Sequence, residues 1–256
     1  MSDKQFSDFR IFHQPKTAGT YCSACLSNER VLPHDKNYHS FVSQHNEVAH
    51  IKPVCIIRDP VDYYISLITF WCLDPSYAGH KFNLGYDKDK LIGHPGYWVS
   101  RGYTNRNFSD ILNNFFDDEF IRNHRDKLSS RHHTYDNYVF RIMKELEIGY
   151  YTFGFLDQFS RKKIKDIKKD ECEEEINYII NHFIILNTRT ISKELKTLCE
   201  DFDVEYIESK KLKQSNRKDI SCYDINQNLI DKIHYKDRYI YKILKHIKQN
   251  TMNNSL

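Results

Sequence analysis

A short polar loop near the start of the chain carries the residues best suited to bind an anion. Residues Pro15–Thr20 read Pro-Lys-Thr-Ala-Gly-Thr and follow a short apolar run, Phe9–His13. A helical pattern begins directly after the loop, so the loop is expected to offer backbone N–H groups and the positive end of a helix dipole. Lys16 adds a full charge, and Gly19 lacks the Cβ that would keep a ligand away from the backbone. These residues indicate recognition of a phosphate-like group.

The order of residues in this loop differs from the common motif for nucleoside triphosphates. That motif reads G-x-x-x-x-G-K-[ST], with the Lys after the second Gly. Here Lys16 precedes Gly19, and there is no first Gly. The chain also lacks a clear apolar run that ends in a Walker B Asp. A P-loop nucleotide kinase or NTPase is therefore kept as an alternative.

A second candidate anion site follows another apolar run. Val54–Ile57 is short and continuous, which is typical of a strand buried on both faces of a parallel sheet. Arg58 comes next, Pro60 suits the first turn of a helix, and Ser66 would lie about two turns into that helix. An Arg fork and a hydroxyl can hold a phosphate dianion. The alternatives are a surface salt bridge for Arg58 and an ordinary helix-surface hydroxyl for Ser66.

The elements that would position these residues alternate along the chain. Apolar runs predict strands at Phe9–His13, Tyr38–Ser43, Val54–Ile57, Tyr150–Phe155 and Val204–Ile207. Spacings of three and four residues predict helices around residues 108–115, 138–146 and 229–247. The sequence therefore predicts an α/β fold, in which residues 1–250 form a single domain with a central parallel sheet flanked by helices. Its first strand, loop and helix would be P-loop-like, and ligands bind beyond the carboxyl ends of such strands.

Three segments stand apart from this pattern. Residues 74–134 are interpreted as an insertion that contributes to a binding site, because aromatic, Arg and His side chains gather in its first half. A self-packed surface insertion is the alternative. Residues 161–175 are dense in charge and predict a solvated helical face, with docking of an acidic partner as the alternative. Residues 251–256 are expected to form a frayed tail.

The composition excludes several classes of protein. The chain has 256 residues, 40% of them hydrophobic, and a net charge of only +3, which gives no general attraction for nucleic acid. No apolar run is long enough for a membrane span and no signal peptide is visible, so a cytoplasmic protein is expected. The seven cysteines are expected to be reduced. Cys22 and Cys25 with His34 and His39 do not have zinc-finger spacing, so no metal is expected.

Taken together, the two motifs resemble those of the sulfotransferases that use PAPS (3′-phosphoadenosine 5′-phosphosulfate). That family carries Pro-Lys-x-x-Gly-Thr for the 5′-phosphosulfate, and Arg-x-Pro with a later Ser for the 3′-phosphate. Pro15–Thr20 is similar to the first motif, and Arg58–Pro60 with Ser66 is similar to the second. The run Phe-His-x-Pro-Lys-Thr-Ala-Gly-Thr most resembles the carbohydrate O-sulfotransferases. The resemblance extends from about Phe9 to Trp71 and returns more weakly up to an acidic residue, Asp157.

The resemblance implies in-line transfer of a sulfuryl group from PAPS to an acceptor hydroxyl, with PAP as the product. Lys16 would contact the bridging oxygen and neutralise the leaving group. The implied nucleotide contacts are Lys16, Thr17, Ala18, Gly19, Thr20 and Tyr21 in the loop, Arg58 and Ser66 at the 3′-phosphate, and Arg217 and Lys218 closing over that phosphate. The acceptor is expected to be a carbohydrate, and no metal is needed because the ammonium and the helix dipole neutralise the charge.

The acceptor hydroxyl also needs a general base. In the carbohydrate branch a Gly-His pair often ends the strand before the Arg-x-Pro strand, and Gln44–His45 stands at the matching place. A neutral imidazole can accept a proton near pH 7. His39, Glu47 and His50 are competing candidates for this role. A nucleotide- or glycan-binding module without catalysis is a further alternative, since the same loop and Arg would still bind PAP.

Overall fold

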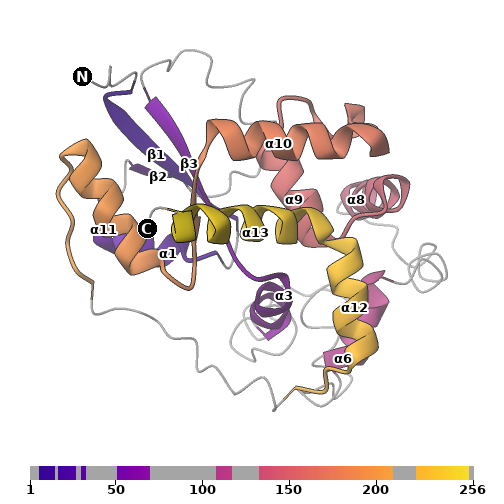
Figure 1. Cartoon of the computed structure of the whole chain (residues 1–256). Helices are drawn as coiled ribbons and strands as arrows, with labels where there is room; N and C mark the ends of the chain where they lie inside the picture. Colours follow the sequence, from indigo (N-terminus) through magenta and orange to yellow (C-terminus); the bar gives the residue numbers. More distant parts are fainter. Residues whose placement is uncertain are drawn as a thin grey trace, which may run out of the picture. The chain divides into compact units, whose positions relative to one another are not determined.

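The computed structural model describes residues 6–14, 17–26, 30–32, 51–69, 108–116, 133–209 and 223–253. The chain forms an α/β structure of parallel strands and surrounding helices (Figure 1). Its tertiary contacts divide it into two units. The first contains Met1–Pro60, Tyr150–Lys213 and Asp237–Leu256, and the second contains Val61–Gly149 and Gln214–Lys236.

A parallel sheet forms the centre of the first unit. Its strands are β1 (Asp8–Phe12), β2 (Val31–Leu32), β3 (Ile51–Ile57) and β4 (Ile184–Asn187). They lie in the order β2-β1-β3-β4, and every neighbouring pair is parallel. The predicted α/β class and parallel sheet are confirmed, as are the predicted strands that became β1 and β3. The sequence did not predict β2 or β4.

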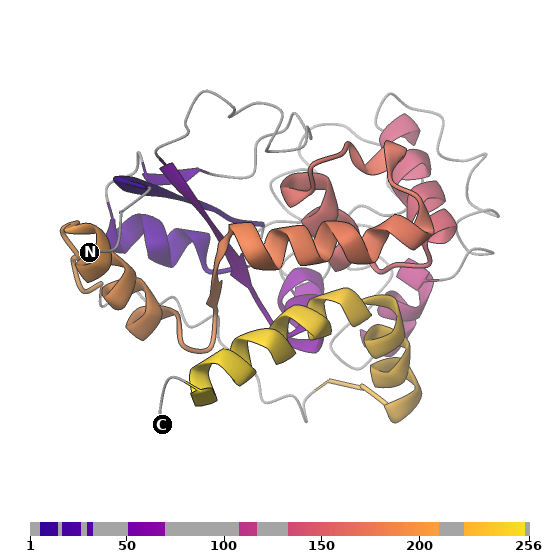
Figure 2. The ribbon, with the colours of Figure 1, turned by 45° about the horizontal axis from the view of Figure 1, so that its top comes forward.

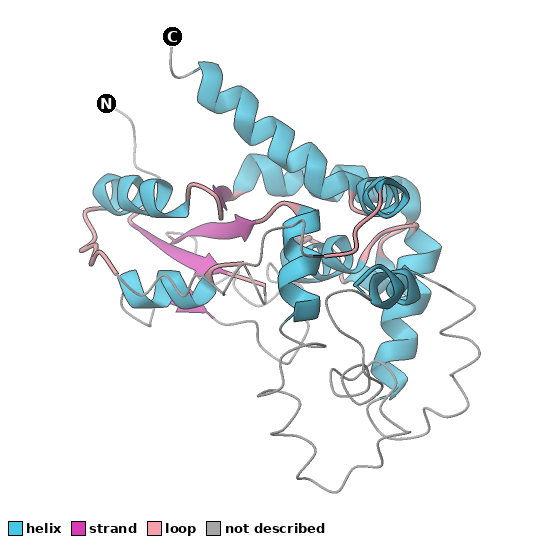
Figure 3. Ribbon diagram, turned by 90° about the horizontal axis from the view of Figure 1, so that it is seen from below, coloured by secondary structure: helices cyan, strands magenta, loops and turns pink. Residues whose placement is uncertain are grey.

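One face of the sheet is covered by α1 (Gly19–Cys25) and α11 (Ile191–Phe202). Alternate side chains of the two central strands pack against these helices: Phe9, Ile11, Val54 and Ile56. Cys55 and Ile57 point to the other face and are also fully buried. Figure 3 shows helices on either side of the strands. Burial on both faces is the reason that β3 reads as an unbroken apolar run.

Three further helices of the first unit contact one another: α9 (Tyr150–Phe159), α10 (Cys172–His182) and α13 (Arg238–Asn253). Figure 2 shows α10 and α13 running side by side, and Lys242 of α13 pairs with Glu173 of α10 at 2.5 Å. Helix α13 continues to Asn253, into the segment that was expected to fray.

The charge-dense stretch before α10 is more tightly attached than a solvated helical face would be. It contains two short 3-10 helices, η6 (Ile164–Asp166) and η7 (Lys169–Glu171), and only then the first turn of α10. The guanidinium of Arg161 pairs with Glu175 at 2.9 Å, and Glu175 is only 1% exposed. The backbone N–H of Arg161 donates to the same carboxylate at 2.8 Å. Arg161 and Glu175 therefore hold the chain together internally and do not belong to a solvated helical face.

Two predicted strands are wrong. Tyr150–Phe155 lies in helix α9, which is buried on nearly all sides, so its apolar residues give no helical spacing in the sequence. Val204–Ile207 is an irregular segment after α11, in which the N–H of Ile207 donates to the Cys25 carbonyl at 3.0 Å. The predicted strand Tyr38–Ser43 lies outside the described residues.

The described part of the second unit is helical. It contains α6 (Phe108–Phe116), α8 (His133–Leu146), α12 (Gln227–Lys236) and most of α3 (Pro60–Ile68). The ring of Phe108 packs edge-on against Tyr223, with centroids 5.3 Å apart. The predicted helices are confirmed, although the last becomes α12 and α13, separated at Asp237. In the part of the chain that the structure describes, no helix is long and apolar enough to cross a membrane.

Asp237 ties the start of α13 to the first turn of α9. Its side chain is fully buried, and its Oδ1 accepts hydrogen bonds from the N–H and the hydroxyl of Thr152, at 2.8 and 2.7 Å. Asp237→Ala removes the acceptor of two buried donors and is expected to lower the free energy of unfolding by about 2–4 kcal/mol. Urea denaturation measures this loss. Asp231→Ala on the exposed side of α12 is the control, and an equal loss in both variants would contradict the assignment.

Candidate functional site

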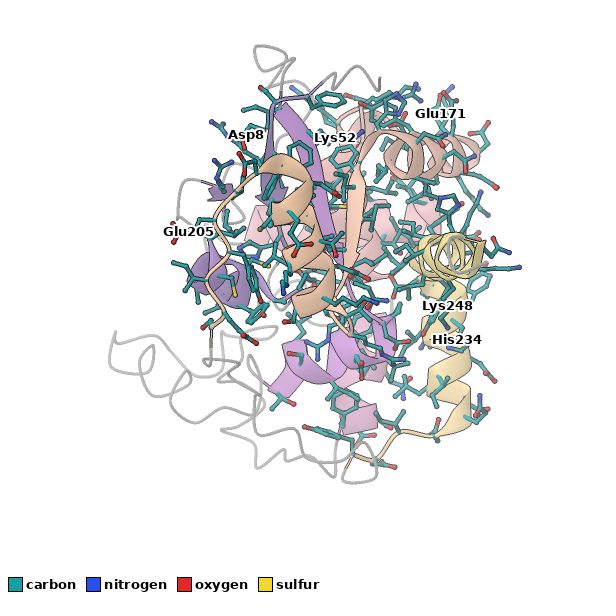
Figure 4. All side chains as sticks on the ribbon, turned by 60° about the vertical axis from the view of Figure 1, so that its left-hand side comes forward. Asp8, Lys52, Glu171, Glu205, His234 and Lys248 are labelled. Atoms are coloured by element: carbon teal, nitrogen blue, oxygen red, sulfur yellow. The ribbon has the colours of Figure 1, made fainter. Side chains whose placement is uncertain are left out.

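The carboxyl edge of the sheet brings the two motif regions close together. β1 and β3 are hydrogen-bonded neighbours, with Phe12 level with Cys55. The chain therefore leaves β1 and β3 at the same edge of the sheet. From β1 it continues into the loop, and from β3 it continues to Arg58. Figure 4 marks the opposite edge, where Asp8 and Lys52 lie at the amino ends of these strands. The loops after β1 and β3 thus start side by side, at the edge of a parallel sheet where ligands bind.

The described part of the loop is a tight turn held by one carbonyl oxygen. The Gln14 carbonyl accepts hydrogen bonds from the N–H of Thr17 at 3.2 Å, from the Thr17 hydroxyl at 2.7 Å, and from Nδ1 of His13 at 3.1 Å. Ala18 follows at φ 62° and ψ 15° and precedes the first turn of α1. This left-handed conformation costs a residue with a Cβ on the order of 1 kcal/mol or more. The surrounding contacts must hold it in place.

Part of the hydrogen-bonding capacity of the loop is used within the chain. The N–H of Thr17 bonds inside the turn, and the N–H of Tyr21 donates to the Ala18 carbonyl at 3.0 Å. No described residue accepts a hydrogen bond from the N–H groups of Ala18, Gly19 and Thr20. Thr20 is also exposed. Among the described loop residues, these three are the ones that can donate to an anion.

Gly19 is required for a reason that differs from the one the sequence indicated. An ideal Cβ at this position would lie 2.1–2.2 Å from three atoms of the His13 imidazole. The space beside Gly19 is therefore filled by a side chain of this protein and not left for a ligand. Because Nδ1 of His13 donates to a carbonyl, Nε2 carries the lone pair of the neutral ring. Burial lowers the pKa of His13 and keeps the imidazole neutral.

The side chain of Tyr21 lies in the core. Tyr21 is 6% exposed, and its hydroxyl bonds the Tyr206 hydroxyl at 3.0 Å, which in turn lies 3.3 Å from that of Ser192. Only the backbone of Tyr21 belongs to the loop. The thiols of Cys22 and Cys25 are also fully buried, and burial raises the pKa of Cys22 to about 12. No group of His, Cys, Asp and Glu side chains among the described residues could hold a metal ion.

Arg58 stands at the end of β3 and is 9% exposed. Its backbone N–H donates to the hydroxyl of Tyr151 in α9 at 2.8 Å. Tyr151 is fully buried, and burial raises its pKa, so the phenol stays neutral. At the next residue, the carboxylate of Asp59 lies 3.8 Å from the guanidinium of Arg189. Arg58 is thus positioned by the strand and by α9.

Several predicted site residues are not brought together by the described structure. Ser66 is half-buried in the second turn of α3. Lys16, His45, Arg217 and Lys218 lie outside the described residues, and so do His39, Glu47 and His50. The roles assigned to these residues stay predictions.

A polar face of α9 was missed by the sequence interpretation. Gly154 of this helix lies against the Gln14 side chain, since an ideal Cβ there would be 3.0 Å from Nε2. Asp157 and Gln158 follow one turn later. Burial raises the pKa of Asp157 to about 7. The only sequence signal was a pair of polar residues shortly after the apolar run Tyr150–Phe155, outside the predicted strand.

The fold and site define an α/β protein with a parallel sheet and a candidate ligand site at its carboxyl edge. Comparison with models of protein families, with curated proteins and with solved structures finds no match in any of the three. The case for a function therefore rests on the residues of this chain.

Proposed function

We propose that the protein is a PAPS-dependent sulfotransferase that acts on a hydroxyl group of a carbohydrate. The observation that carries this proposal is the adjacency of β1 and β3. It places the start of a Pro-Lys-Thr-Ala-Gly-Thr loop beside an Arg that leaves the neighbouring strand. One nucleotide with phosphate groups at its 5′ and 3′ positions could use both. In this proposal the fold is a single sulfotransferase-type P-loop domain, with residues 74–134 on the acceptor side.

The loop would hold the 5′-phosphosulfate through the N–H groups of Ala18, Gly19 and Thr20 and through the ammonium of Lys16. Arg58 and Ser66 would hold the 3′-phosphate, and Arg217 with Lys218 would close over it. The acceptor oxygen attacks the sulfur, the bond from sulfur to the phosphate oxygen breaks, and PAP leaves with the electron pair. The hydroxyl proton passes to His45. Most of the rate enhancement comes from positioning and from charge stabilisation at the leaving oxygen.

Nucleotide selectivity tests the proposal against the kinase alternative. Titration calorimetry of PAP, ADP and ATP with Mg²⁺ is expected to show the tightest binding for PAP. Arg58→Ala should weaken PAP binding by about 100-fold or more, because a charge-assisted bidentate contact is lost. Arg141→Ala, on the exposed side of α8, is the matched control. A preference for ATP with Mg²⁺ would favour the kinase or NTPase alternative.

Sulfuryl transfer separates an enzyme from a silent binding module. With radiolabelled PAPS and a panel of sugars, phenols and peptides, the wild type is expected to label at least one acceptor. Lys16→Ala should lower kcat by about 100-fold or more, since one preorganised donor to the leaving oxygen is removed. Tight PAP binding without transfer to any acceptor would support the binding module.

A further inference from the structure

We infer that Arg189 is a second cation for the 3′-phosphate of the nucleotide and sets the preference for a nucleotide that carries this group. The inference rests on the proposed sulfotransferase function. Arg189 follows β4, the strand that neighbours β3 on the side away from β1. The sequence did not predict β4, so no role was assigned to the residues that leave its carboxyl end.

The carboxyl ends of β3 and β4 lie together at the edge of the sheet that carries the candidate site. Ile57 is level with Asn187, and the N–H of Thr188 donates to the Ile57 carbonyl at 2.9 Å. The chain therefore passes through Arg58 just beyond β3 and through Arg189 just beyond β4. Both residues belong to the same compact unit. Since neighbouring strands are about 4.8 Å apart, the two Arg residues leave the sheet close to each other.

The turn that carries Arg189 is held by several hydrogen bonds. The backbone N–H of Arg189 donates to Oδ1 of Asn187 at 3.0 Å, and the N–H of Thr190 donates to the Asn187 carbonyl at 3.0 Å. The carboxylate of Glu194, in the first turn of α11, accepts from the Asn187 N–H at 2.6 Å and from the Thr190 hydroxyl. The backbone at Arg189 is therefore fixed before a ligand binds, which lowers the entropic cost of binding.

The side chain of Arg189 reaches toward the end of β3. Its Nη2 lies 3.8 Å from Oδ2 of Asp59, the residue after Arg58, and the Arg189 side chain is 60% exposed. This distance exceeds the hydrogen-bond range, and ion pairs at the surface stabilise a protein little. A phosphate dianion carries more charge than a carboxylate and matches the guanidinium fork. The Arg189 guanidinium can therefore contact a phosphate in place of Asp59 at little cost in stability.

The order of the strands places Arg189 on the 3′ side of the proposed nucleotide. The loop after β1 would hold the 5′-phosphosulfate, and Arg58 after β3 would hold the 3′-phosphate. The nucleotide thus extends from β1 toward β3, and β4 is the next strand in that direction. Arg58 is 9% exposed, whereas the side chain of Arg189 is open to solvent. A dianion at this edge would be held by Arg58 from its buried side and by Arg189 from its exposed side.

A comparison of two nucleotides tests this assignment. PAP and 5′-AMP differ only in the 3′-phosphate, and titration calorimetry measures the affinity of each for the wild type and the variants. Arg189→Ala is expected to weaken PAP binding by about tenfold, because one charge-assisted contact is lost, while AMP affinity stays within about twofold. Arg189→Gln keeps a polar side chain without the charge and should show the same selective loss. Lys196→Ala, which removes an exposed cation further along α11, is the matched control.

Three outcomes would overturn the role of Arg189 and leave the proposed function standing: unchanged PAP affinity in the variants, an equal loss of PAP and AMP affinity, or a wild type that binds PAP no better than AMP. If Arg189→Ala does not fold, the Gln variant decides by the same criteria. Absence of PAP binding in the wild type is a different result. It would end the proposed function, and Arg189 would then have no 3′-phosphate to hold.

Discussion

Gly19→Ala is expected to damage the loop, although Gly19 occupies a helical position where Ala is ordinarily favoured. The new Cβ would overlap the His13 ring at 2.1–2.2 Å. His13 cannot move away freely, because it belongs to the chain directly after β1 and donates to the Gln14 carbonyl at 3.1 Å. Overpacking of this kind costs typically about 1–3 kcal/mol. Urea denaturation is expected to show that loss, together with at least tenfold weaker PAP binding.

The double variant His13→Ala/Gly19→Ala identifies the cause. Without the imidazole, the three atoms nearest to a Cβ at position 19 are gone, so Ala there is expected to gain its helix preference of about 1 kcal/mol over Gly. The double variant is therefore expected to be more stable than His13→Ala alone. Such a reversal of sign is a direct measure of coupling between the two positions. If Gly19→Ala is equally harmful with and without His13, the contact with His13 is not the reason for the Gly.

Asp157 is expected to make the stability of the protein fall as the pH rises from about 4 to about 7. The pKa of Asp157 is about 7 in the folded chain, against 3.8 for an unperturbed Asp. Between these values the folded state holds the proton and the unfolded state does not, so deprotonation favours unfolding. A difference of about 3 pKa units corresponds to about 4 kcal/mol. This contribution is present below pH 4 and is lost above pH 7.

Asp157→Asn isolates that contribution. The amide cannot ionise, so the variant and the wild type should have similar stability at pH 4, and the variant should be more stable by about 4 kcal/mol at pH 8. The quantity to compare is the difference in free energy of unfolding between the two proteins, measured in urea at several pH values. Asp170→Asn, at an exposed position of η7, is the control. A difference that does not change with pH would show that the carboxyl is ionised in the folded state.

Local features of the chain were enough to predict much of the sheet edge. Val54–Ile57 is apolar at every position because β3 is buried on both faces, and Pro60 begins α3 because its fixed φ suits a first helical turn. The parallel alternation of strands and helices then placed the loop and Arg58 at neighbouring strand ends. These predictions depend on local patterns and on one topological rule, both of which can be read from sequence.

Tertiary packing decided the remaining features. Helix α9 is surrounded by other elements, so its residues are apolar on nearly all sides. The spacing of three and four residues between apolar positions, which marks a helix with one exposed face, is therefore missing from the sequence. For this reason the segment was mistaken for a strand. The contact of His13 with Gly19, and of Gln14 with Gly154, depends on how the strand ends are covered. Burial of Asp157 likewise depends on α9 being a helix. The sequence by itself determined which residues could bind an anion and in which class of fold. Only the tertiary structure decided which polar groups are left buried without partners, because desolvation depends on every element packed around a side chain.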